Sequence, residues 1–379
     1  MIYFDNSATT KPYKEVLDTF VKVSEDIFGN PSSLHSLGVE AERVLTKSRE
    51  LVAHLLGVEA KEIFFTSGGT EGNNVAIRTV CETYRSRGRH IITSSVEHPS
   101  VYETFQALEK QGYNVTYVPV NRDGVVSVSD VIKSIRDNTI LVSLIHVNNE
   151  TGSIQPIEQI GEELKKIPKV IFHVDGVQGV TKVPLNIKKA GIDLYTISGH
   201  KFHGLKGTGV LYVRANLRLQ PLFTGGGQES GFRAGTENVA GMAALAKALK
   251  MSLEKANKKL PELRKIRDYI FEQLEKMDGV VVNSPKNGAP HIINFSIPNT
   301  KPEVVIQALS QKKIYVSTKS ACSSKLNEPS RVILAMGLGE ERASSAIRVS
   351  LNFDNTLEEA KTFLTELKQV IIQLKEVMR

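Results

Sequence analysis

Short, nearly continuous apolar runs alternate with longer amphipathic segments through the first half of the chain. The short runs predict buried β-strands at residues 62–66, 90–94, 114–118, 140–146, 170–174 and 194–197. The longer segments carry apolar residues at helical spacing and predict helices at residues 39–56, 72–84, 101–111 and 157–166. Buried strands that alternate with helices indicate an α/β fold with a parallel sheet covered on both faces.

The pattern changes after the glycine cluster at residues 225–227. A long helical segment at 239–277 precedes an alternating strand at 290–297, a helix at 302–311, a loop with Cys322, a strand at 345–351 and a charged amphipathic helix. We therefore expect a large α/β domain at residues 12–255. Residues 1–11 and 256–379 would form a small α+β domain that carries the cysteine loop.

The composition is that of a globular protein. Of the 379 residues, 41% are hydrophobic and 23% are charged, which excludes a disordered or fibrous chain. The net charge of +7 arises from basic residues interspersed with acidic ones, so we expect no direct nucleic-acid binding. No apolar stretch is long enough for a membrane span, and the first residues do not resemble an export signal. We expect a cytoplasmic protein that does not bind membranes.

The chain has two cysteines, Cys81 and Cys322. Two distant thiols exclude a disulfide scaffold and a zinc site built from several thiolates, and we predict no metal site. Cys81 lies among apolar residues of a predicted helix and is expected in the core. Cys322 lies in a polar segment, residues 317–324, where Lys319 could stabilise a thiolate. Cys322 is therefore the candidate nucleophile.

Two charged residues follow predicted strands directly. Lys201 follows the strand at 194–197, and Asp175 follows the strand at 170–174. In isolation, Lys201 could be a surface turn residue and Asp175 a helix N-cap. In a parallel sheet, however, both would lie at the carboxyl edge, where ligands bind. A lysine with its pKa lowered by burial can form a Schiff base, and together with an acid it matches the requirements of pyridoxal phosphate.

Further polar groups follow other predicted strands. The sequence Ser-Gly-Gly-Thr-Glu at 67–71 joins a strand to a helix, whose N-terminal N–H groups can bind an anion. It matches neither the nucleotide P-loop nor the dinucleotide fingerprint, so a small phosphate monoester fits better. His98 and Asn149 also follow strands. The imidazole of His98 could stack on an aromatic cofactor and exchange protons.

These motifs belong to one collinear series. It comprises Ser-Gly-Gly-Thr-Glu at 67–71, Glu-His-Pro at 97–99, His-Val-Asn-Asn-Glu at 146–150, His-Val-Asp at 173–175, Ser-Gly-His-Lys at 198–201, Arg-Ala-Gly-Thr at 233–236, Ser-Ala-Cys at 320–322 and Ile-Arg-Val-Ser at 347–350. From residue 5 almost to its end, the chain resembles the cysteine desulfurases of the NifS/IscS type, class V members of the fold-type-I pyridoxal-phosphate enzymes. The resemblance implies a large domain with a mainly parallel, seven-stranded sheet between helices, plus a small α+β domain.

The resemblance implies a cofactor, pyridoxal 5′-phosphate, and the residues that bind it. Lys201 would bind it covalently, Asp175 would keep the ring nitrogen protonated, and Gln178 would contact the ring hydroxyl. Thr236 would reach the phosphate from the neighbouring subunit of a homodimer. The complete cofactor-binding set would be Gly69, Thr70, His98, Asn149, Asp175, Gln178, Ser198, His200, Lys201 and Thr236.

The resemblance also implies a reaction, the conversion of L-cysteine to L-alanine. Lys201 and His98 would move protons, and Asn149 and Arg348 would hold the substrate carboxylate, to which an arginine can donate two parallel hydrogen bonds. Cys322 would take the sulfur as a persulfide. A sulfur-acceptor protein would then receive it, which could be an iron–sulfur scaffold, a tRNA-thiolation enzyme or a protein of a cofactor pathway.

Two positions depart from the pattern of the family. Lys319 stands where glycine is usual, which could strain the segment before Cys322 or change its path. Gly176 replaces the usual alanine, without an expected effect. The length of the segment from Cys322 to Pro329 is similar to that in the group with an extended catalytic loop.

The sequence leaves other functions open. A related pyridoxal-phosphate lyase or aminotransferase, for example one that prefers selenocysteine, is one alternative, although simple transamination needs no loop thiol. A catalytically idle scaffold protein is another, although it would not need Lys201, Asp175, His98 and Cys322 together. The sequence does not identify the sulfur acceptor or its pathway.

Overall fold

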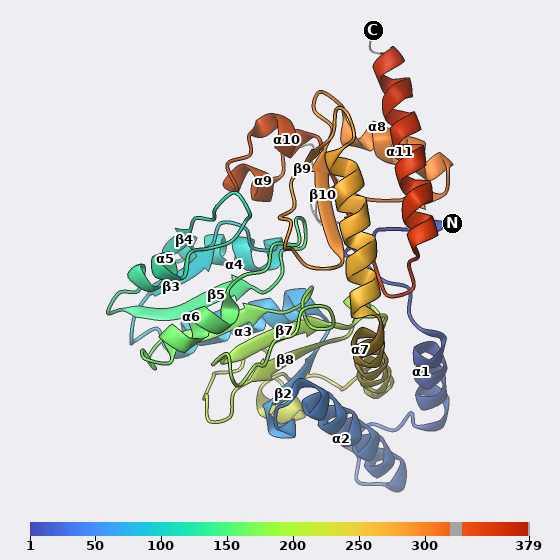
Figure 1. The fold of residues 1–379 in the computed structure, drawn as a ribbon. Coiled ribbons are helices and arrows are strands. Elements are labelled where there is room, and N and C mark those ends of the chain that lie inside the picture. Colours follow the sequence, from blue (N-terminus) through green and yellow to red (C-terminus); the bar gives the residue numbers. More distant parts are fainter. Residues whose placement is uncertain (319–327, 378–379) are drawn as a thin grey trace.

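A seven-stranded sheet forms the centre of the larger part of the molecule, as the computed structural model shows for residues 1–318 and 328–377 (Figure 1). Its strands are β2 (Ile63–Thr66), β3 (His90–Ser94), β4 (Asn114–Val118), β5 (Thr139–Ile145), β6 (Ile171–Asp175), β7 (Leu194–Ser198) and β8 (Gly209–Val213). They are ordered β2-β8-β7-β6-β5-β3-β4, with β8 antiparallel to its two neighbours. The predicted mainly parallel sheet is confirmed.

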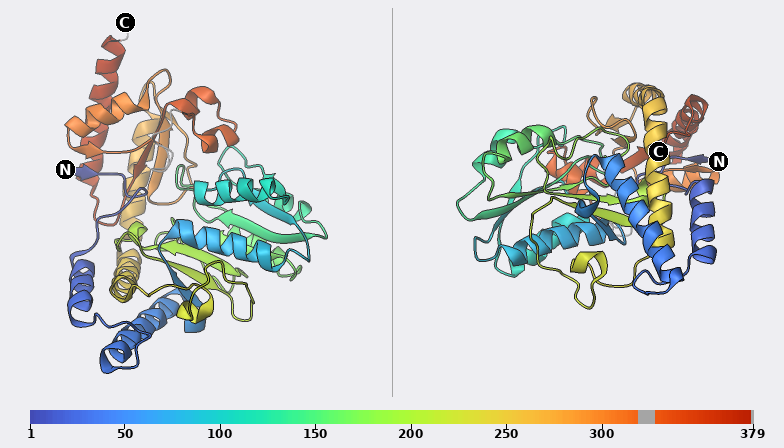
Figure 2. Two further views of the ribbon diagram at one scale, coloured as in Figure 1. Left: turned by 180° about the vertical axis from the view of Figure 1, so that it is seen from behind. Right: turned by 90° about the horizontal axis from the view of Figure 1, so that it is seen from below.

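Helices cover both faces of this sheet (Figures 1 and 2). One face packs against α3 (Gly69–Thr83) and α4 (Pro99–Lys110). The other packs against α1 (Lys14–Asp26), α2 (Ser36–Leu56), α5 (Val128–Lys133), α6 (Ile157–Leu164) and the first part of α7 (Val239–Glu275). On β6, Ile171 belongs to the first core and Phe172 to the second. Burial on both faces explains why these strands are continuous apolar runs.

A second, smaller core surrounds two short sheets. The antiparallel sheet consists of β9 (Val281–Val282), β10 (Ile292–Ser296) and β12 (Ala346–Ser350), and β1 (Ile2–Tyr3) pairs in parallel with β11 (Ile314–Tyr315). The helices of this region are α8 (Pro302–Gln311), α9 (Arg331–Ala335), α10 (Glu340–Ser344) and α11 (Leu357–Val377). None of the described helices is long and apolar enough to cross a membrane.

Helix α7 belongs to both cores. Its residues Met242 to Leu249 pack into the core of the large sheet, whereas Leu263, Ile266, Ile270 and Leu274 pack into the smaller core. The helix continues through residues 255 and 256, where we place the domain boundary. The division into two domains therefore remains a proposal, supported by the change of core along this helix.

Helix α3 begins earlier than the sequence indicated. The predicted start was residue 72, but the first helical residue is Gly69. Glu71 accepts a hydrogen bond of 2.9 Å from the backbone N–H of Ser67, and this bond organises the turn before the helix. The N-terminus of α3 consequently lies directly beside the glycine-rich turn.

Candidate active site

A cavity of about 230 Å³ opens at the carboxyl edge of the central sheet. The residues that the sequence predicted for the site and that line this cavity are Gly69, Thr70, His98, Asn149, Asp175, Gln178, Ser198, His200, Lys201 and Arg348. They come from the ends of several neighbouring strands and from β12 of the smaller core. The topology thus brings together residues that are far apart in sequence.

Lys201 lies in a short 3₁₀ turn, Gly199–Lys201, immediately after β7. Its Nζ donates hydrogen bonds to the carbonyl oxygens of Ser7, at 2.5 Å, and Ala8, at 2.9 Å. Both residues also line the cavity, and sequence analysis did not include them. The polar run at residues 5–10 was the one feature of the sequence that could have indicated them. Every residue type has a backbone carbonyl, however, so no sequence pattern marks this contact. These carbonyls hold the lysine amine inside the cavity.

The carboxylate of Asp175 is buried at the end of β6. Its Oδ1 accepts the backbone N–H of Val177 at 3.0 Å, and its Oδ2 accepts an amide N–H of Asn73 at 2.8 Å. Burial raises the pKa of Asp175, and these two hydrogen bonds and the charge of Lys201 oppose that shift. Asp175 is therefore suited to bind a cationic N–H in the cavity.

His98 is the N-cap residue of α4 and faces the same cavity. Burial lowers the pKa of His98 to about 3, and the positive charges of Lys201 and Arg331 contribute to the shift. The imidazole is consequently neutral at physiological pH. A neutral ring can stack on an aromatic group and still hold one transferable proton.

The N-terminus of α3 forms an anion-binding corner of the cavity, with Gly69 and Thr70 next to Ser198 and His200. A Cβ at Gly69 would approach Val177 to 2.9 Å, so glycine keeps the backbone accessible there. Burial lowers the pKa of His200 to about 4, so this ring is a neutral hydrogen-bonding group. Backbone N–H groups and the helix dipole favour a phosphate at this corner.

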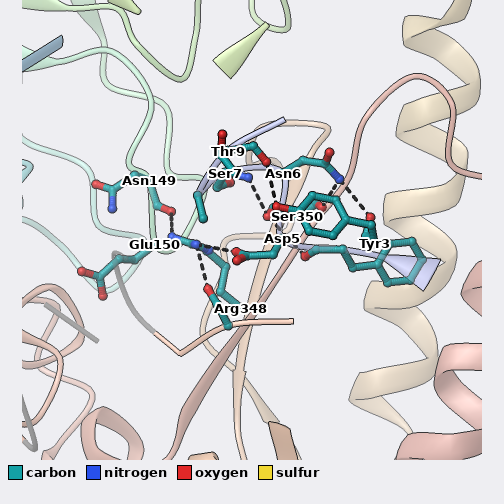
Figure 3. Close-up of polar contacts among 12 residues, drawn as sticks. Tyr3, Asp5, Asn6, Ser7, Thr9, Asn149, Glu150, Arg348 and Ser350 are labelled. Atoms are coloured by element: carbon teal, nitrogen blue, oxygen red, sulfur yellow. Dashed lines mark hydrogen bonds and ion pairs between the residues drawn. The ribbon is translucent and has the colours of Figure 1, made fainter. Parts of the chain in front are cut away.

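Arg348, on β12, also lines the cavity, and Figure 3 shows its polar contacts. Its Nη1 donates to the carbonyl oxygen of Asn149 at 2.9 Å. Its Nη2 donates to Asp5 Oδ1 at 3.0 Å and to Ser317 Oγ at 2.8 Å, and the buried Nε has no partner among the described residues. Because both Nη2 protons are in use, a substrate carboxylate can be bound at two points only if Asp5 or Ser317 releases one.

The structure explains why glycine, and not the usual alanine, occupies position 176. A Cβ at this position would lie 2.0 Å from the ring of Tyr195 on the adjacent strand β7. Tyr195 is buried, and no rearrangement short of moving its ring would make room. The ring of Tyr195 therefore requires a residue without a Cβ at position 176.

The remaining predicted site residues do not lie in this cavity. Thr236 is exposed and does not line it. Cys322 and Lys319 lie outside the described residues. Cys81 is buried, and burial raises the pKa of its thiol to about 12, as expected for a core cysteine. Within the described residues, no group of three or more His, Cys, Asp or Glu side chains could hold a metal ion.

A mainly parallel sheet whose carboxyl edge carries a lysine, a buried aspartate and an anion-binding helix N-terminus defines a pyridoxal-phosphate enzyme of fold type I. The family model described as Aminotransferase class-V matches residues 2–363, and the chain belongs to this family. The residues of the cavity fit its cofactor, pyridoxal 5′-phosphate: Lys201 for the aldehyde, Asp175 for the ring nitrogen and the α3 N-terminus for the phosphate.

Individual relatives are similar over nearly their whole length. A protein of Lactobacillus delbrueckii subsp. bulgaricus named NifS/IcsS protein homolog is 44% identical and covers 98% of this chain and 97% of its own. The cysteine desulfurase IscS of Dictyoglomus turgidum is 41% identical, covering 99% and 96%. Among solved structures, a NifS-like protein matches with a TM-score of 0.92 at 38% identity, covering 98% of this chain and 99% of that one. A structure titled SspA in complex with cysteine matches with a TM-score of 0.83 at 35% identity, covering 93% and 99%.

Proposed function

We propose that this protein is a pyridoxal-phosphate-dependent cysteine desulfurase that converts L-cysteine to L-alanine. The observation that carries the proposal is the 41% identity, over 378 residues, to a relative named cysteine desulfurase IscS, combined with the cavity that gathers Lys201, Asp175 and His98. Several further relatives carry the same name. The bound cofactor supplies an electron sink for the α-carbon of the amino-acid substrate.

The described residues of the chain supply binding and proton transfer. Lys201 would hold the cofactor through its Nζ, and its amine would act as the base toward the α-proton of the substrate. His98 would lie against the cofactor and would exchange a proton at its imidazole. Gln178, whose amide donates to the carbonyl oxygen of Ser7 at 3.0 Å, would contact the ring hydroxyl of the cofactor in place of this bond. Asn149 and Arg348 orient the substrate by its carboxylate.

Cys322 takes the sulfur. Its thiolate attacks the sulfur of the substrate, the carbon–sulfur bond breaks with its electron pair staying on carbon, and a Cys322 persulfide forms. An acceptor protein for iron–sulfur cluster assembly or for tRNA or cofactor thiolation receives the sulfane sulfur. Reduction of the persulfide by a thiol instead releases sulfide, which gives a direct assay. We place this activity in the cytoplasm.

A homodimer completes the site in this proposal. Thr236 is exposed and lies outside the cavity of its own chain, so it is available to the cofactor phosphate of a neighbouring subunit. The segment around it is anchored by the ion pair of Arg233 with Glu71, at 2.7 Å, and by that of Arg49 with Glu229, at 2.7 Å. These two ion pairs would present Thr236 to the partner.

Replacing each of the two cysteines in turn tests the role of Cys322, with Cys81 as the control. The cofactor-loaded protein is incubated with L-cysteine and a thiol reductant, and alanine and sulfide are measured. Cys322→Ala is expected to bind cofactor normally and to release no sulfide, whereas Cys81→Ala keeps the activity of the unmodified protein. Lys201→Ala is expected to lose the absorbance of the bound cofactor. Undiminished sulfide release by Cys322→Ala would contradict the proposed role of this thiol.

A further inference from the structure

A continuous chain of hydrogen bonds connects Asp175 to His98 in the lining of the cavity. Asn73 Nδ2 donates to Asp175 Oδ2 at 2.8 Å and to Ser100 Oγ at 2.9 Å, and Ser100 Oγ lies 2.8 Å from His98 Nδ1. Asn73 belongs to α3, Asp175 ends β6, and Ser100 lies in the first turn of α4. Asn73, Asp175 and Ser100 are 1%, 2% and 9% exposed. Bulk water therefore does not compete for these bonds.

The carboxylate fixes the orientation of the Asn73 amide. An ionised Asp175 can only accept hydrogen bonds, so the NH₂ group of Asn73 must face it. The opposite orientation would place Asn73 Oδ1 against the carboxylate. In the observed orientation both amide protons are engaged, while the buried Oδ1 has no hydrogen-bond partner among the described residues. The two hydrogen bonds donated by the Asn73 amide therefore outweigh the cost of leaving its oxygen without a partner.

The direction of the next bond follows. His98 Nδ1 carries a lone pair, because it accepts the backbone N–H of Ser100, so the hydroxyl of Ser100 can only donate to it. The backbone N–H of Ser100 donates to the same Nδ1 at 3.1 Å. Two donors thus converge on Nδ1, which must carry a lone pair. The neutral ring therefore holds its proton on Nε2, and Nε2 has no hydrogen-bond partner within the described part of the chain.

We propose that Asn73 and Ser100 are positioning residues that lock His98 as the neutral, Nε2-protonated tautomer and tie this lock to the charge of Asp175. The assignment rests on the proposed function, which gives His98 its place beside the cofactor. His98 then presents one N–H donor to the cavity, and any proton it gives or receives passes through Nε2. Protonation of Asp175 would free the Asn73 amide to turn, and the lock would be lost.

The charges around His98 reinforce its neutral state. Lys201 faces it from the turn after β7, Arg331 from α9 and Arg348 from β12, and the positive charge of each disfavours an imidazolium, whereas His200 is neutral in this pH range. The acidic groups nearby are Asp175, reached through Asn73 and Ser100, and Glu97, the preceding residue. Burial keeps Glu97 protonated at neutral pH by raising its pKa to about 8, so it does not offset the cations.

Nuclear magnetic resonance of the ring nitrogens tests the lock independently of turnover. The holoenzyme is labelled with ring-¹⁵N histidine, and a His98→Gln spectrum assigns the two signals of His98. We expect an unprotonated Nδ1 and a protonated Nε2 that do not change between pH 6 and pH 9. A proton on Nδ1 in the unmodified protein would overturn the proposal, even if no variant could be prepared.

Variants test the two positioning residues. Ser100→Ala and Asn73→Ala are each expected to reduce the preference for the Nε2-protonated form about fivefold, the equivalent of one net hydrogen bond. The double variant should match the single ones, because the two residues act in series. Ser100→Thr keeps the hydroxyl and should restore the original signals. Thr104→Val, which removes a hydroxyl one turn further along α4, should leave them unchanged.

Turnover separates this proposal from the proposed function. Ser100→Ala is expected to lower kcat for alanine formation several-fold with little change in KM, because Ser100 does not contact the substrate carboxylate site. Unchanged His98 signals in Ser100→Ala would overturn the lock while leaving the desulfurase activity intact. An unmodified protein with the predicted signals but no alanine formation would instead refute the proposed function alone.

Discussion

Replacing Glu97 by glutamine would isolate the stability cost of one buried carboxyl group. Glu97 is 1% exposed, its Oε1 bonds Ser94 Oγ at 2.5 Å, and its Oε2 has no partner among the described residues. Burial, with a smaller contribution from the charge of Asp175, raises the pKa of Glu97 from 4.5 to about 8. Between these two pKa values the folded state keeps the proton of Glu97 and the unfolded state has lost it. The free energy of unfolding therefore decreases as the pH rises through this range.

The shift fixes the size and the pH range of the effect. One pH unit corresponds to about 1.4 kcal/mol when a group is protonated in only one of the two states. Between pH 5.5 and pH 7.5, the free energy of unfolding of the unmodified protein should therefore fall by about 2.5 kcal/mol relative to Glu97→Gln. The loss should begin near pH 4.5 and be complete above about pH 8.

Urea unfolding of the cofactor-free protein, followed by circular dichroism at a fixed protein concentration, would measure this difference. Glu109→Gln, an exposed change near the end of the following helix, α4, should follow the unmodified protein at every pH. If the Glu97→Gln and unmodified curves ran parallel between pH 5.5 and pH 7.5, the carboxyl would be ionised throughout. That result would refute the argument that burial keeps it neutral.

Two further substitutions test other contacts of the site. Asp5→Asn removes the carboxylate at 3.0 Å from the buried Arg348, which should destabilise the substrate-free protein by about 1–3 kcal/mol. A carboxylate ligand such as L-alanine should then raise the melting temperature of the variant more than that of the unmodified protein; equal increases would show that Asp5 does not occupy the carboxylate position. Gly176→Ala should cost about 1–3 kcal/mol by forcing Tyr195 to move. Adding Tyr195→Leu should recover most of this loss in thermal unfolding, and no recovery would mean that the clash is elsewhere.

The predicted parts of the site are those that depend on local sequence. Lys201, Asp175 and His98 follow short apolar runs that predict buried strands, and parallel strands place their carboxyl ends at one edge. Asn73 was missed although it lies one helical turn beyond Gly69 and Thr70, because its importance depends on Asp175. The carbonyl oxygens of Ser7 and Ala8 were missed because a contact across more than half of the chain leaves no local pattern.

Helix boundaries show the same limit. The start of α3 depends on a side chain, Glu71, that bonds backward to Ser67, and the apolar periodicity begins only after it. The pairing of β1 with β11 joins two strands of two residues each, too short for any periodicity to appear. Tertiary contacts, and not propensity, determine these elements.

The central claim is that the sulfur of L-cysteine passes to Cys322. The most direct measurement is mass spectrometry of peptides from the cofactor-loaded protein after a brief reaction with a limiting amount of L-cysteine and no reductant. The peptide that contains Cys322 should gain the mass of one sulfur atom, the peptide that contains Cys81 should not, and the gain should equal the alanine formed. Alanine formation with an unmodified Cys322, or with the added sulfur on Cys81, would contradict the account.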